Sequence, residues 1–138
     1  MAIELFWDND EKTVMLCEIK NPWTWNQLFS TLEKIKQVTD RSTHTIGAIL
    51  DLTDGASVPG GSIFNPTTLG YAKKMFQMGE GGTGPIVVVG ASPMIRTVYN
   101  AALTIDREKL SHFTFAKALD EGREIIYEKM RQYAPPAI

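Results

Sequence analysis

Two apolar stretches decide the fold of this chain: TIGAILD at 45–51 and PIVVVG at 85–90. Each has the length of a strand and is almost wholly apolar, which is typical of a strand covered on both faces, as in a parallel sheet. Two helices are predicted after them, over about 66–78 and 93–105. Each is preceded by an N-cap residue, Asn or Ser, and has Pro at its first position. Alternating strands and helices predict parallel pairing with crossover connections.

Toward the N-terminus, the sequence predicts a β-hairpin followed by a helix. Residues 3–7 and 13–19 are rich in strand formers, and an Asp-Asn-Asp turn separates them. Thr24 lies three residues before Gln27, which is the spacing of a capping box. Apolar residues at helical spacing follow, so we expect an amphipathic helix over about 24–40.

Toward the C-terminus, the pattern predicts one more strand and one more helix. We expect a short strand at 110–113, with Thr114 capping a final helix that turns Gly122 and Ile126 inward. The order is β-β-α-β-α-β-α-β-α. The fold class is therefore α/β: one domain over 1–138, with a mostly parallel sheet of four or five strands, an N-terminal hairpin and four helices.

Composition excludes several classes of protein. The chain has 138 residues, 16 acidic and 14 basic side chains and a net charge of −2. Its lone Cys17 excludes an intrachain disulfide framework, and no apolar run reaches the ~20 residues of a membrane helix. Without a basic cluster we expect no nucleic-acid partner, and without a signal peptide we expect a cytoplasmic protein. His44 and His112 lack metal-ligand spacing. No metal or cofactor is predicted.

The order of elements and two short stretches carry a family resemblance. ILDLT at 49–53 is similar to the third strand of the STAS family, the SpoIIAA-like anti-sigma-factor antagonists and sulfate-transporter tails. TTLG at 67–70 is similar to the segment that opens the family's second helix. The resemblance implies a STAS-like fold and a non-enzymatic regulatory domain that binds other proteins.

The resemblance also implies a phosphorylation switch. Aligned on Leu69 and Gly70, Thr67 takes the position of the Ser that a partner kinase phosphorylates in the family, and Thr68 lies beside it. A phosphate in the first turn of a helix would meet free N–H groups and the positive end of the helix dipole. The simpler interpretation is that Asn65, Thr67 and Thr68 only cap the helix.

The carboxyl edge of the predicted sheet is where open α/β proteins usually bind ligands. Asp51 ends a strand there, and the long loop over 53–66 carries apolar side chains among polar ones. Such side chains either fold back onto the sheet or form a contact patch. The candidate binding surface comprises Asp51, Thr53, Asp54, Val58, Ile63, Phe64, Asn65, Tyr71 and Ser92.

Three functions are compatible with these residues. The first is binding of a protein partner, with a regulatory kinase as one such partner and a second copy of the chain, through the hairpin, as another. The second is binding of a small molecule or lipid in an apolar pocket under the 53–66 loop, lined by Ile63, Phe64, Met75 and Met78. The third, enzymatic, function would require Asp51, Asp54 and Ser92 to converge. We expect the first and assign no reaction.

Overall fold

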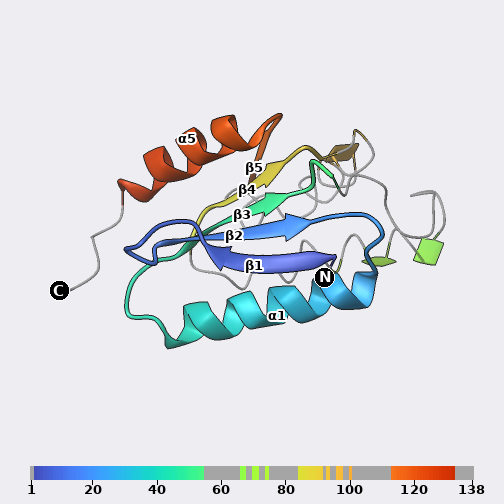
Figure 1. The fold of residues 1–138 in the computed structure, drawn as a ribbon, viewed down its shortest axis with the longest axis horizontal. Helices are drawn as coiled ribbons and strands as arrows, with labels where there is room; N and C mark the ends of the chain where they lie inside the picture. The colour runs from blue at the N-terminus through green and yellow to red at the C-terminus, as the bar shows by residue number, and fades with distance from the viewer. Residues whose placement is uncertain are drawn as a thin grey trace.

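The structure is a computed structural model that describes residues 2–54, 66–67, 70–71, 74, 84–91, 93, 96–97, 100 and 113–132. Five strands form one sheet in the order β1-β2-β3-β4-β5 (Figure 1). Their bounds are Ile3–Trp7, Val14–Ile19, Gly47–Asp51, Ile86–Val89 and Phe113–Ala116. Two helices have bounds within these residues: α1, Trp25–Arg41, and α5, Leu119–Met130.

The strand pairing confirms the predicted hairpin and the predicted parallel sheet. β1 pairs antiparallel with β2, with Leu5 opposite Cys17, and all other neighbouring strands pair in parallel. Because β2 to β5 run in one direction, their carboxyl ends meet at one edge of the sheet. That edge is the end toward which the β2, β3 and β4 arrowheads point in Figure 1.

The two helices cover opposite faces of the sheet and create two apolar layers (Figure 1). Side chains alternate between the faces along each strand. In β3, for example, Leu50 packs in the α1 layer and Ile49 in the α5 layer. The same alternation in β4 explains why all four residues of Ile86–Val89 are buried. Burial on both faces is why these two strands contain almost no polar side chains.

The capping box fixes where α1 begins. The N–H of Gln27 donates to Thr24 Oγ1 at 3.1 Å, and the N–H of Thr24 donates to Gln27 Oε1 at 2.9 Å. Leu28 and Leu32, one turn apart, are buried against the sheet. The helix predicted over about 24–40 is thus confirmed within one residue at each end.

The predicted C-terminal boundaries are wrong by several residues. The last strand is Phe113–Ala116 instead of 110–113, so Thr114 lies inside β5, opposite Val87 of β4, and caps no helix. α5 starts after Ala118, which makes no side-chain capping bond. Pairing with β4 determines the position of this strand, because Phe113 lies opposite Ile86 and Ala116 lies opposite Val89 at the two ends of β4.

The predicted helices over 66–78 and 93–105 fall mostly outside the described residues. Those that are described within them are helical: 66–67, 70–71, 74, 93, 96–97 and 100. The α/β class and the mixed five-stranded sheet are therefore established, whereas four complete helices and a specifically STAS-like fold stay predictions.

A partly buried polar contact joins the hairpin turn to α5. Asp8 Oδ1 accepts hydrogen bonds from Arg123 Nε at 3.1 Å and Nη2 at 3.0 Å, and Asp8 Oδ2 accepts one from the Tyr127 hydroxyl at 2.7 Å. The Asp8 side chain is only 5% exposed. The hydrogen bond to Asp8 raises the pKa of Arg123, while burial and then the same carboxylate raise the pKa of Tyr127.

Candidate functional site

The carboxyl end of β3 is shaped by the side chain of Asp51. Its Oδ1 accepts hydrogen bonds from the Thr53 N–H at 2.9 Å and from Thr53 Oγ1 at 2.6 Å. This is an Asx turn, in which the side-chain carboxylate accepts a hydrogen bond from the backbone N–H two residues later. One carboxylate oxygen of Asp51 is therefore used to direct the chain out of the sheet.

The chain leaving β4 packs closely against this turn. Gly90 has φ +71°, and a Cβ built at Gly90 would lie 2.9 Å from both Cα and N of Thr53. The left-handed conformation and the close approach both favour Gly at this position. The N–H of Gly90 donates to the Ala116 carbonyl at 3.0 Å, so the ends of β3, β4 and β5 are held together.

The chain leaving β2 joins the same edge through Asp54. The N–H of Asn21 donates to the Asp54 carbonyl at 2.9 Å. Trp23 and Trp25 follow, are both buried, and contact each other edge to face at 5.1 Å between ring centroids. Asp54 thus lies beside the segment that joins β2 to α1, at the carboxyl edge where Asp51 ends β3.

An aromatic cluster extends this edge to the surface; we define it as Trp25, Phe29, Tyr71 and Lys74. The Tyr71 ring stacks on Trp25 at 5.7 Å and lies 5.9 Å from Phe29. Lys74 Nζ lies 4.5 Å from the centroid of the Phe29 ring, within the range of a cation–π contact. Trp25 and Phe29 are buried, whereas Tyr71 is 40% exposed. The cluster presents one aromatic ring to solvent on a rigid aromatic base.

A small hollow with two cationic side chains lies at the ends of β4 and β5. Its volume is about 180 Å³. The Arg96 guanidinium lies 5.3 Å from the centroid of the Phe115 ring, which holds it over that aromatic face. The lining residues are Gly90, Ala91, Arg96, Phe115, Ala116 and Lys117.

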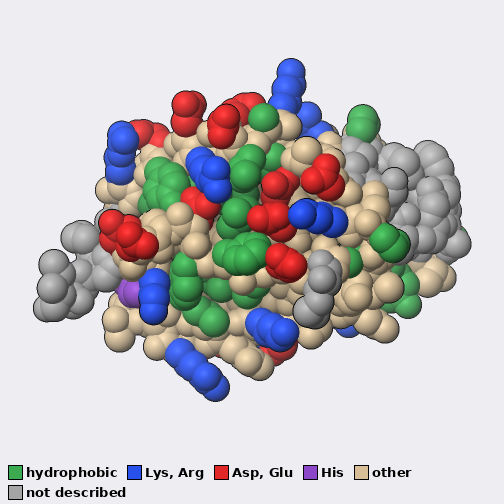
Figure 2. Space-filling model, viewed as in Figure 1, with side chains coloured by type: hydrophobic (Ala, Val, Ile, Leu, Met, Phe, Trp, Pro, Cys, Tyr) green, Lys and Arg blue, Asp and Glu red, His purple; other side chains and the backbone are tan. Residues whose placement is uncertain are grey.

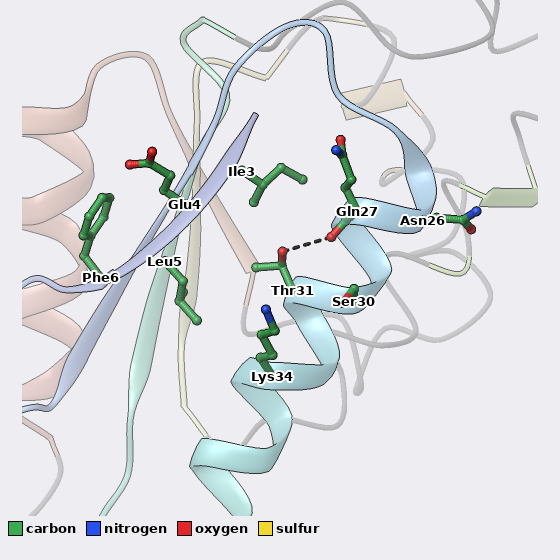
Figure 3. Close-up of a pocket in the computed structure, with 9 residues that line it drawn as sticks. All are labelled: Ile3, Glu4, Leu5, Phe6, Asn26, Gln27, Ser30, Thr31 and Lys34. Carbon is green, nitrogen blue, oxygen red and sulfur yellow. Dashed lines mark hydrogen bonds between the residues drawn. The ribbon is translucent and has the colours of Figure 1, made fainter. Parts of the chain in front are cut away.

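A second hollow, of about 780 Å³, lies between the edge strand β1 and α1 (Figure 3). Ile3 and Leu5 point from β1 toward α1, while Glu4 and Phe6 point away from it. Thr31 and Lys34 line the opposite wall on α1. This groove could not be predicted from the sequence, because it arises from the distance between a strand and a helix.

Four of the nine predicted surface residues are described, and all four lie at the carboxyl edge: Asp51, Thr53, Asp54 and Tyr71. Thr67 is exposed and helical. The remaining predicted positions lie outside the described residues, as does the apolar pocket expected under the 53–66 loop; these are Val58, Ile63, Phe64, Asn65, Thr68, Met75, Met78 and Ser92.

The partners of Tyr71 could not be predicted from the sequence. The apolar residues at helical spacing over 24–40 indicate only a core face of α1, and Lys74 is not among the predicted surface residues. Arg96, Phe115 and Lys117 were also missed. Trp25 and Phe29 lie far from Tyr71 and Lys74 in the sequence, so no local pattern signals that these side chains meet.

Cys17 is buried in β2, and its environment suppresses its reactivity. Burial, together with the negative charges of Asp51 and Glu18, raises the pKa of the Cys17 thiol to about 12. Cys17 is therefore a buried thiol of low reactivity. Within the described part of the chain, no three His, Cys, Asp or Glu side chains are grouped as ligands for a metal ion.

Comparisons with known proteins give no family for this chain. No family model matches it, and no curated protein sequence matches it. In the portion that the structure describes, no helix has both the length and the apolar character needed to cross a membrane.

Proposed function

We propose that this protein is a non-enzymatic interaction domain, similar in role to the STAS anti-sigma-factor antagonists, which binds a partner protein at the carboxyl edge of its sheet. The observation that carries the proposal is the exposed Tyr71 ring stacked on Trp25. Aromatic side chains are enriched at the centres of protein interfaces, and a few such residues supply most of the binding energy.

The packing beneath Tyr71 favours binding. A ring already held by Trp25 and Phe29 loses little side-chain entropy when a partner covers it. Lys74 supplies a positive charge over the neighbouring Phe29 ring. A partner with an apolar patch bordered by acidic side chains would complement this surface.

The role of Asp51 favours binding over catalysis. Its Oδ1 accepts two hydrogen bonds from Thr53, so the side chain fixes the backbone turn at the carboxyl edge of the sheet. Asp54 contributes its backbone carbonyl to Asn21 in the same way. These contacts give the surface a fixed shape, which a recognition site requires.

Affinity capture with matched variants tests the proposal. Wild-type protein, Tyr71→Ser and the control Arg131→Ser are used as baits in extract of the native organism, and recovered proteins are quantified by mass spectrometry. Arg131 is highly exposed and lies at the end of α5. We expect a partner recovered by wild type and Arg131→Ser and reduced about 30-fold by Tyr71→Ser, as for a hot spot of ~2 kcal/mol. Equal recovery by all three baits would contradict the proposal.

We further propose that phosphorylation of Thr67 regulates this binding. Thr67 is exposed, and the predicted helix places it one turn before Tyr71. A phosphate there would add a charge of about −2 next to the recognition surface. Incubation with extract and ATP should add one phosphate by intact mass, lost in the double variant Thr67→Ala, Thr68→Ala. Absence of that mass shift would leave binding without this switch.

A further inference from the structure

The outer edge of β1 has backbone groups that no described strand pairs with. The N–H of Asp8 donates to the Val14 carbonyl at 2.8 Å, and the N–H of Lys20 donates to the Ala2 carbonyl at 2.8 Å. Hydrogen-bonded positions alternate along an antiparallel pair, so the even-numbered residues of β1 face β2. Ile3, Leu5 and Trp7 therefore direct their N–H and C=O groups away from the sheet.

The same strand carries two of the large apolar side chains that the described residues expose. Phe6 is 43% exposed and Trp7 is 37% exposed. They lie on opposite faces of the sheet, because successive side chains of a strand alternate. In Figure 2, apolar side chains are interspersed with charged ones on the side of the molecule where β1 lies in Figure 1. An unpaired edge with exposed aromatic side chains is a template for strand addition.

We propose that β1 pairs antiparallel with β1 of a second copy, with a two-fold axis at Leu5, so that two five-stranded sheets become one. This interface is distinct from the carboxyl edge proposed for partner binding. The occupant is a second copy because the outward groups are symmetric about Leu5, and a two-fold interface must be self-complementary.

The positions of the outward groups and charges select this register. With the axis at Leu5, Ile3 faces Trp7 of the second copy and Leu5 faces its equivalent, so all three outward residues pair. An axis at Glu4 would set two carboxylates directly opposite each other, which is unfavourable. An axis at Phe6 would leave Ile3 outside the ladder. Of these three two-fold registers, only the Leu5-centred one uses every outward group without opposing like charges.

The groove between β1 and α1 provides space for the second copy. Residues directly opposite in a ladder point to the same face. Trp7 of the second copy would therefore lie beside Ile3, on the side of the sheet where Ile3 faces the groove wall at Gln27 and Thr31 (Figure 3). On the other face, Phe6 of the second copy would lie beside Glu4. One pairing thus covers both exposed aromatic side chains of β1.

Sedimentation of the full chain over a range of concentrations tests the assembly. We expect a reversible species of twice the chain mass for wild type and for Tyr71→Lys, which changes an exposed aromatic elsewhere. Leu5→Pro removes an outward N–H without removing a bond to β2, and should leave only monomer. Trp7→Lys should raise the dissociation constant of the dimer at least 10-fold, and this variant does not require β1 to accept a Pro. Circular dichroism checks that each variant is folded.

Cysteine cross-linking tests the register. Opposite residues of a hydrogen-bonded pair have Cα atoms about 5.5 Å apart, which a disulfide can span. Leu5→Cys should form a disulfide-linked dimer under mild oxidation, because Leu5 faces its equivalent. Trp7→Cys should not, since the two Trp7 positions are four residues apart along the ladder. Wild-type Cys17 is buried and serves as the background.

Four results would overturn the proposal. The first is a chain that stays monomeric at all concentrations. The second is a dimer that persists in both Leu5→Pro and Trp7→Lys, which would place the interface elsewhere. The third is equal cross-linking of Leu5→Cys and Trp7→Cys. If instead β1 is protected from hydrogen exchange only when another protein is added, the edge binds a different partner and the self-pairing is wrong.

Discussion

Single glycines set how closely α5 can approach the sheet. A Cβ at Gly122 would lie 2.6 Å from Val89 Cγ2, and a Cβ at Gly47 would lie 3.0 Å from both Ile126 Cδ1 and Met130 Sδ. Gly122 lies in α5 and Gly47 lies in β3, so the two glycines lie on the two sides of the interface between α5 and the sheet. Close packing of α5 therefore depends on the absence of a side chain at both positions.

We predict that Gly122→Ala destabilises the protein by about 1–2 kcal/mol. The higher helix propensity of Ala is outweighed by the steric conflict with Val89. Gly70→Ala is the matched control: Gly70 is helical and exposed, and a Cβ there would meet nothing within 4 Å. It should raise stability by about 0.5–1 kcal/mol. Urea unfolding of both variants checks the prediction, and equal effects would contradict the packing argument.

We predict that the buried Cys17 thiol lowers the stability of the folded protein at alkaline pH. Its thiol pKa is raised from 9.0 to about 12 in the folded protein. Between pH 9 and 12 the folded thiol keeps its proton, whereas the unfolded thiol has lost it. The contribution of Cys17 to the free energy of unfolding is therefore fully present below pH 9 and is lost as the pH rises toward 12. Between pH 9 and 11, wild type should lose stability relative to Cys17→Ala by up to ~1.4 kcal/mol per pH unit.

Unfolding of wild type and Cys17→Ala at pH 8, 9, 10 and 11 measures that difference. Tyr127 titrates in the same direction in both proteins and so cancels in the comparison. Parallel pH profiles of the two proteins would show that Cys17 is accessible to solvent. Slow modification of the native thiol by a disulfide reagent at pH 8 gives an independent check.

At the scale of elements, Asp8 joins the β1–β2 turn to α5 across 115 residues of sequence. We predict that Tyr127→Phe lowers stability by about 1–2 kcal/mol, because it removes one hydrogen bond to a buried carboxylate. The exposed pair of Glu128 and Arg131 is the control. Glu128→Ala should change stability by less than about 0.5 kcal/mol in thermal unfolding. A similar loss in both variants would contradict a special role for Asp8.

The elements that could be predicted have strong local signals. The capping box of α1 is a side-chain pattern, and β3 and β4 are apolar throughout because helices cover both faces of the sheet. The start of α5 has no such signal, since Ala118 forms no side-chain cap. The sequence therefore predicts Thr114 as the cap, although Phe113-Thr114-Phe115 alternates as a strand does. Asp120 and Glu121, acidic residues of the first turn, were the better signal.

At the scale of the whole molecule, parallel strand order explains why part of the site could be predicted. Parallel strands end at one edge, so Asp51, Thr53 and Asp54 could be placed there from the sequence. The aromatic cluster could not be predicted from the sequence, because Trp25 and Tyr71 meet only through tertiary packing. The β1–α1 groove depends on a strand–helix separation that no local pattern encodes.

The proposed function depends most on the carboxyl edge, marked by Tyr71, being a surface that binds another protein. Photo-crosslinking in the native organism tests this directly, with p-benzoylphenylalanine in place of Tyr71 and, as the control, in place of Arg131. We predict a discrete crosslinked product of higher mass with the probe at 71 and none at 131. No product at 71, or the same products at both positions, would contradict it.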